Sequence, residues 1–246
     1  MKSLRKSWAI AKKDMRIYYL KGPVLIFGIL FPLFLFCAFV IGRNVPATSL
    51  VPGLIGMALF FTASATTPSV LPFETRTRTL ERLLAAPLTL PLLIGGDVLA
   101  AFLFGAVLSL IPVAIGFWAL NATLARPLFL VLAITLSALC FATMGTLFST
   151  PPTDNPSTIM TISNLVRLPL VFISGVFLPI SNMPAWGQWV SRLSPLTYTT
   201  ELVRHAIGDT THISAGVCIV MLSAFALAFW YLSLALHHRN MSRRLV

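Results

Sequence analysis

The sequence predicts an all-α integral membrane protein with six transmembrane helices in one domain that covers residues 1–246. Two observations predict this class. Hydrophobic residues make up 57% of the chain and charged residues 10%, whereas a soluble domain carries about 25% charged residues. The apolar residues also form uncharged or nearly uncharged runs, and about 20 such residues are enough to cross a bilayer as a helix.

Six apolar runs are long enough to span a membrane. The third is longer than a bilayer requires, so we expect it to tilt or to bend at Pro112. The first is too long for a cleavable signal peptide, and no small-residue cleavage site follows it before Arg43. Six spans leave too little chain for a soluble domain. The runs cover residues 23–41, 50–71, 92–120, 127–148, 159–180 and 215–236.

The basic residues predict the orientation of the chain. Thirteen of the 18 Lys and Arg residues lie before the first span, after the second or after the sixth, and four lie on the opposite side. The positive-inside rule therefore predicts a protein of the cell membrane with both termini and the 73–91 loop on the cytoplasmic side. The net charge of +11 is then mostly a topology signal. A nucleic-acid partner is not expected, because the basic residues flank spans instead of forming one patch.

Amphipathic helices are expected at both surfaces of the bilayer. Before the first span, an apolar stripe with basic residues opposite predicts a helix in the inner interface, most simply an anchor. Its members are Leu4, Trp8, Ala11, Met15 and Tyr18. In the outer segment 181–212, Pro184 and Ser194-Pro195 predict two helix starts, with Ser194 as N-cap. These two short helices would form an interfacial collar or a lid over a pathway, and the pattern does not separate the two.

A short amphipathic helix is predicted directly after the second span. Leu80, Leu83, Leu84 and Pro87 recur with helical spacing on one face, whereas Glu81 and Arg82 point the other way. Pro87 ends the helix. A helix this short cannot span the bilayer, so we expect a protein outside the bilayer to bind it.

Two charged residues lie within predicted spans. Asp97 is a turn or two inside span three, and Arg167 is about two turns inside span five, close to Pro169. A charge near the bilayer centre costs roughly 2.5–3.5 kcal/mol, so such side chains usually face protein or water. The two residues approach from the same side and would pair with each other, or Arg167 would line a cavity. The alternative is that Arg167 reaches the inner head groups and Asp97 is interfacial.

The residues needed for catalysis in the membrane are scarce. The three cysteines are isolated within spans, and His237 and His238 lack the helical spacing of metal ligands. The sequence contains no phosphate-binding loop, metalloprotease motif or nucleophile elbow. We therefore expect no metal and no cofactor bound by this chain, and ATP-driven work would need a second polypeptide.

Three motifs together resemble the type-2 ATP-binding-cassette (ABC) transporter permeases of drug, nodulation-factor and polysaccharide exporters. The first, residues 79–88, is similar to the family's Gly-Thr-Leu-Glu-x-Leu-Leu-x-x-Pro-Leu loop after span two. The others are residues 174–184, Ser-Gly-Val-Phe-Leu-Pro-Ile-Ser-Asn-Met-Pro, and residues 194–198, Ser-Pro-Leu-Thr-Tyr, followed by Glu201 and Arg204. The chain departs from the pattern at Arg78, which stands where the family has glycine, and Glu74-Thr75-Arg76 keeps only the first acid of Glu-Arg-Glu.

The resemblance implies a permease subunit of an ATP-driven exporter that performs no chemistry itself. Two copies of the permease, or two related permeases, would pair with two cytoplasmic ABC ATPase subunits, which bind ATP and Mg. The complex would export a drug, lipid or glycan-like substrate. The coupling segment would comprise Arg78, Thr79, Leu80, Glu81, Arg82, Leu83, Leu84 and Pro87. Independently of the resemblance, Arg167 and Asp97 are candidates for a substrate pathway or interface: Arg167 would line the cavity between the two copies or pair with Asp97. The alternative classes are an ATP-independent secondary transporter and an intramembrane enzyme. Secondary transporters often contain inverted repeats, and the two halves of this sequence show no convincing repeat.

Overall fold

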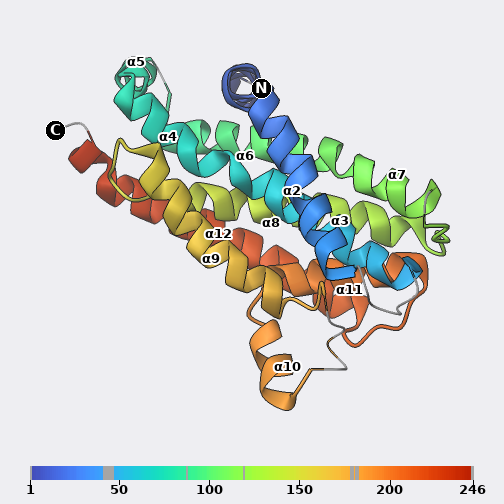
Figure 1. Cartoon of the computed structure of the whole chain (residues 1–246). Helices are drawn as coiled ribbons and strands as arrows, with labels where there is room; N and C mark the ends of the chain where they lie inside the picture. The colour runs from blue at the N-terminus through green and yellow to red at the C-terminus, as the bar shows by residue number, and fades with distance from the viewer. Residues whose placement is uncertain are drawn as a thin grey trace.

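The computed structural model describes residues 2–40, 47–86, 88–118, 120–177, 180 and 183–244. Within these ranges the regular structure is helical and no strand occurs, as Figure 1 shows. The all-α class predicted from the sequence is therefore confirmed. The elements are α1 (Lys2–Asp14), η1, a π-helical turn (Met15–Tyr19), α2 (Gly22–Val40), α3 (Ala47–Ala65), α4 (Thr67–Arg76), α5 (Thr79–Ala85), α6 (Leu90–Leu108), α7 (Leu110–Trp118), α8 (Pro127–Phe148), α9 (Pro156–Ile173), α10 (Ala185–Ser191), α11 (Pro195–Ile207) and α12 (Ala215–Arg244).

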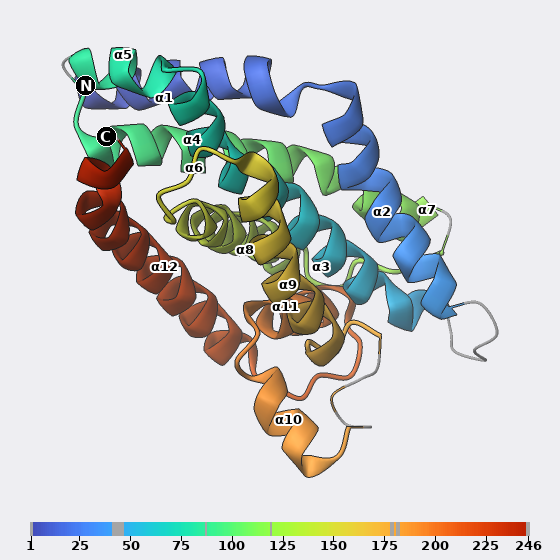
Figure 2. The same ribbon diagram turned by 60° about the vertical axis from the view of Figure 1, so that its left-hand side comes forward.

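Five helical segments of the described chain are long and apolar enough to cross a membrane. A sixth is obtained if the pair Arg5–Tyr19 and Val24–Leu35, which is bent by 89°, counts as one broken span. The bend leaves α1 almost perpendicular to α2 in Figure 2. The five unbroken segments are Leu50–Arg76, Leu90–Trp118, Pro127–Phe148, Pro156–Ile173 and Ala215–Asn240.

Breaks divide two of these segments. The second span continues five residues beyond its predicted end and is interrupted at Thr66, between α3 and α4. The long third span is interrupted at Ser109, three residues before the expected bend at Pro112. Pro112 has no N–H to donate to the carbonyl of Leu108, and its ring crowds that carbonyl, so α6 ends at Leu108.

Helix α8 lies at the centre of the bundle and packs against α12, α6, α3 and α11. Its Phe141 meets Phe60 of α3 edge to face, with ring centroids 5.0 Å apart. Close approach depends on small residues elsewhere. A Cβ on Gly105 of α6 would lie 2.6 Å from the Cβ of Ala63 of α3, so only glycine permits this separation.

The outer part of the chain differs from the prediction in two respects. Helix α9 ends at Ile173, seven residues before the predicted end of span five, and Gly175 follows with φ of 78°. Helices α10 and α11 begin where Pro184 and Pro195 predicted. However, α11 is buried along nearly its whole length against α8, α12 and α3 and is not a surface collar.

Ser194 does not act as the predicted side-chain cap of α11. Its hydroxyl donates to the carbonyl of Leu170 in α9 instead, at 3.2 Å. The hydroxyl therefore joins α11 to α9. Helix α10 remains on the surface, where Trp186, Trp189 and the following Leu193 are exposed.

The two ends of the bundle carry different elements. Helix α5, the N-terminal helix and the C-terminal end of α12 lie at one end, and α10 and α11 lie toward the other (Figures 1 and 2). The segments that the charge distribution assigned to one side of the membrane are thus grouped in space.

Candidate functional site

Helix α5 is a seven-residue helix that follows α4 after a tight turn. The turn is closed by threonine hydroxyls: Thr77 donates to the carbonyl of Phe73 at 2.8 Å, and Thr79 donates to the carbonyl of Glu74 at 3.2 Å. Arg78 precedes the helix with φ of 56° and ψ of 20°, in the left-handed region that favours glycine. This is the position at which the resembling motif has glycine.

The two faces of α5 have different surroundings. Leu80 is 1% exposed and packs with Ile10 of α1 and Leu93 of α6. Glu81 and Arg82 are exposed on the opposite side. The inward position of Leu80 differs from the expectation that this leucine faces a partner, since its contacts lie within the chain. Leu83 is partly buried against the same cluster.

Two members of the predicted coupling segment cannot be placed. Pro87 lies outside the described residues, and so does the side chain of Leu84. Among the described residues from the end of α4 through α5, the exposed charged side chains are Arg76, Arg78, Glu81 and Arg82. Three of these four side chains are basic.

A cluster of buried charges lies next to α5. The ammonium of Lys13 in α1 contacts the carboxylate of Asp14 at 2.9 Å and that of Glu74 at the end of α4. Asp14, Glu74 and Asp97 are all buried, and Asp97 of α6 lies close enough to Asp14 and Glu74 to interact with both. The cluster thus joins three segments, α1, α4 and α6.

Lys13 is the cation of this cluster. Burial lowers the pKa of Lys13, but the carboxylates of Asp14 and Glu74 outweigh burial, so the pKa is raised above its ordinary value. The ammonium form is therefore favoured where α1 meets α4. Sequence reasoning singled out Asp97 but missed Lys13, Asp14 and Glu74. Asp14 offered a signal, because it is the one acid in the basic segment that precedes the first span.

Arg167 lies in a different part of the molecule. Its side chain is 1% exposed, and one guanidinium nitrogen, Nη2, donates to the carbonyl of Ser64 in α3 at 2.7 Å. Nη1 donates weakly to Asn164 at 3.4 Å, and the guanidinium carbon lies 5.9 Å from the centre of the Phe148 ring. The predicted Asp97–Arg167 pair is not among the ion pairs of the described residues. The cavity interpretation also lacks support, because Arg167 is buried within a single chain.

The motif residues of the outer segment hold a loop in place. A carboxylate oxygen of Glu201 accepts backbone N–H groups of His212 and Ile213 at 2.8 and 3.2 Å. Arg204 bridges this carboxylate at 3.5 Å and that of Asp209 at 2.9 Å. Glu201 and Arg204 therefore stabilise the connection from α11 to α12.

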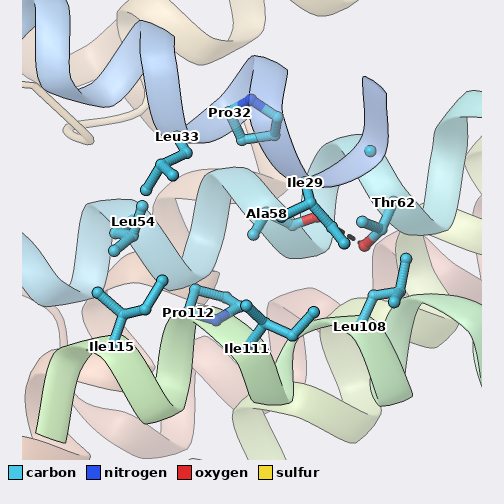
Figure 3. Close-up of a pocket in the computed structure, with 11 residues that line it drawn as sticks. Ile29, Pro32, Leu33, Leu54, Ala58, Thr62, Leu108, Ile111, Pro112 and Ile115 are labelled. Carbon is cyan, nitrogen blue, oxygen red and sulfur yellow. Dashed lines mark hydrogen bonds between the residues drawn. The ribbon is translucent and has the colours of Figure 1, made fainter. Parts of the chain in front are cut away.

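Two hollows among the long helices are apolar. Figure 3 shows a gap of about 20 Å³ between α2, α3 and the α6–α7 break, lined by Pro32, Ala58 and Pro112 among others. The hydroxyl of Thr62 at its edge donates to the carbonyl of Ala58 at 2.6 Å, so this gap offers no free polar group there. A larger open groove of about 460 Å³ lies between α6, α8 and α12.

Among the described residues, no three His, Cys, Asp or Glu side chains are grouped so that they could hold a metal ion. The fold defines a multi-pass helical membrane protein. The family model described as "ABC-2 type transporter" matches residues 5–207, and the chain belongs to this family. The resemblance drawn from the sequence motifs is confirmed.

Curated relatives agree with this assignment. The chain is 28% identical over 190 residues to the inner membrane transport permease YadH of Escherichia coli K12, with 74% of this chain and 73% of YadH covered. Nodulation protein J of Sinorhizobium fredii is 29% identical over 168 residues, covering 67% of this chain and 62% of that protein. The probable multidrug ABC transporter permease YbhR of Escherichia coli K12 is 26% identical over 155 residues, covering 63% and 42%.

Proposed function

We propose that this chain is the membrane-spanning subunit of an ATP-driven exporter, and that a separate cytoplasmic ABC ATPase docks on α5. The observation that carries the proposal is the two-sided packing of α5. Leu80 anchors the helix to α1 and α6, while Glu81 and Arg82 project outward. A helix held this way transmits a push from its outer face to the spans behind it. ATP and Mg bind to the partner, because this sequence lacks a phosphate-binding loop.

The charge of the docking surface suggests the chemistry of its partner. Arg76, Arg78 and Arg82 outnumber Glu81, so a groove with excess negative charge would complement the surface. Arg78 occupies a backbone conformation that costs a non-glycine residue about 1 kcal/mol. The presence of arginine in this strained conformation supports a contact role for its side chain.

The remaining features of the exporter are part of the same proposal. Both termini and α5 lie in the cytoplasm, as the charge distribution predicts. A second permease copy packs against α9, whose outward side chains Leu165 and Phe172 are exposed. The substrate is a drug, lipid or glycan-like molecule, and the transport direction is outward. The similarity to YadH and YbhR, both named as permeases, supports transport as the activity.

Affinity purification in mild detergent tests the docking surface. The wild-type chain should retain an ABC ATPase subunit, identified by mass spectrometry. The variants Arg76→Glu and Arg82→Glu should each retain about tenfold less ATPase than the wild type. Thermal unfolding should not change, because both side chains are exposed. The matched control is Arg126→Glu, an exposed arginine outside the docking surface. Normal ATPase recovery with both docking-surface variants would contradict the assignment.

Arg78→Gly separates a contact role from a conformational one. Glycine adopts the observed backbone angles without strain, so α5 should keep its structure. If the side chain contacts the ATPase, Arg78→Gly binds it several-fold more weakly despite an intact fold. ATPase binding equal to wild type would mean that Arg78 only forms the turn.

A further inference from the structure

The break between α3 and α4 exposes backbone groups inside the bundle. In a continuous helix the carbonyl of Ser64 would accept the N–H of residue 68, but that residue is Pro68, which has no N–H. A buried carbonyl without a donor costs free energy, so another element has to supply one. The donor at this position is Nη2 of Arg167, at 2.7 Å.

Elements η1 and α8 also pack against this break. The hydroxyl of Thr67 forms a hydrogen bond with the hydroxyl of Tyr19 at 2.8 Å. On α8, a Cβ at Gly145 would lie 3.1 Å from the Cβ of Thr67 and 3.3 Å from the carbonyl oxygen of Ser64, so α8 packs closely against the break. Elements η1, α8 and α9 therefore contact the break, and α9 contributes the charged side chain of Arg167 to it.

Burial makes Arg167 a costly donor. Its Nε has no hydrogen-bond partner, and no carboxylate forms an ion pair with it among the described residues. The guanidinium group of arginine stays protonated in proteins, so burial does not remove its charge. Among the described residues, the guanidinium of Arg167 is therefore stabilised mainly by its hydrogen bond to the carbonyl of Ser64 and by its position over the ring of Phe148.

The position of the bond suggests what it does. Within this chain, α9 packs most extensively against α4, and α4 continues through the Thr77 turn into α5. We propose that Arg167 is a positioning residue that ties α9 to the Pro68 break, so that α4, α5 and α9 move as one unit when the ATPase acts on α5. This proposal rests on the proposed function for the source of the motion, but the tie itself is a property of the permease alone.

A double-mutant cycle on the purified permease tests the tie. Pro68→Ala returns an N–H that can reach the Ser64 carbonyl, so it should compensate for the loss of Arg167. In the Arg167→Leu background, Pro68→Ala should raise the unfolding temperature by roughly 2–4 °C more than it does in the wild-type background. The same effect of Pro68→Ala in both backgrounds overturns the tie. Unfolding temperature alone is not decisive for Arg167→Leu, because removal of a buried charge has its own stabilising effect.

A distance measurement tests the coupling. Spin labels at Ala85 of α5 and Thr158 of α9, both exposed, report the position of α5 relative to α9 in a cysteine-free background. Labelled protomers are diluted in unlabelled protein. In the wild type, the distance should stay narrow and unchanged when the ATPase complex is trapped with ATP and vanadate. In Arg167→Leu, it should broaden or shift by about 2 Å or more, and Arg167→Lys should restore the narrow distribution. Arg192→Leu, an exposed arginine on another element, serves as control.

The outcomes separate the two proposals. If no ATPase binds the wild-type permease, the proposed function fails, and the tie is still judged from the double-mutant cycle and the label distance in the permease alone. If the ATPase binds and Arg167→Leu shows the wild-type distance with and without trapping, the positioning role of Arg167 is overturned.

Discussion

Truncation of Leu80 gives the sharpest test of how α5 is held. Leu80 is 1% exposed and contacts Ile10 and Leu93, so Leu80→Ala removes a fully buried side chain at a cost of about 2–5 kcal/mol. Because α5 is a seven-residue helix at one end of the bundle, we expect the loss to appear as local opening and not as global unfolding. At about 1.4 kcal/mol per factor of ten, even 2 kcal/mol raises the open fraction about 30-fold.

Hydrogen–deuterium exchange of the detergent-solubilised permease, without ATPase, measures this opening. Amides of α5 should exchange about 30-fold faster or more in Leu80→Ala, and ATPase binding should weaken because the docking helix is no longer ordered. The control Leu193→Ala removes a leucine that is 69% exposed and should leave α5 unchanged. Unaltered exchange combined with lost ATPase binding would refute the reasoning, since it would place Leu80 in direct contact with the partner.

Three further predictions concern the buried charges and the orientation. Lys13→Ala leaves the Glu74 carboxylate without its cation and should cost about 3 kcal/mol in thermal unfolding, part of which Glu74→Gln recovers in the double variant; absence of recovery would mean that the pair is not the cause. Glu201→Ala removes the acceptor of two backbone N–H groups and should cost about 2–3 kcal/mol by the same assay, whereas Glu201→Gln keeps an acceptor and should cost less. In cysteine-free protein, an impermeant maleimide should label a cysteine at Leu193 in intact cells and not one at Thr77; the reverse pattern would invert the topology.

The choice of position 193 for labelling depends on side-chain burial, which the sequence does not reveal. The outer loop is predicted from apolar runs and charges, but its individual positions differ in access. Ser191 is buried and its hydroxyl donates to the carbonyl of Gln188, whereas Leu193, two residues later, is exposed. Sequence position alone would not distinguish these two as labelling sites.

The pattern of apolar runs predicted the spans because length and hydropathy are properties of each segment by itself. Proline positions likewise predicted the helix starts at Pro184 and Pro195 and the bend close to Pro112, since the missing N–H acts locally. The end of α9 was misplaced, because residues 174–180 are apolar enough to extend a helix. Gly175, with its positive φ, lies just beyond Ile173, where α9 ends.

The sequence by itself determined the membrane class, the order of the spans, the amphipathic character of α5 and the family to which the chain belongs. Only the tertiary structure decided that Leu80 faces inward and that α11 is buried. It also decided that Arg167 donates a hydrogen bond to a carbonyl of α3 and does not pair with Asp97. The physical reason is that lipid tails and protein interiors are similarly apolar, so a hydrophobic pattern does not reveal which of them a helix face meets. A backbone carbonyl freed by proline is equally invisible in side-chain patterns until a distant residue is seen to satisfy it.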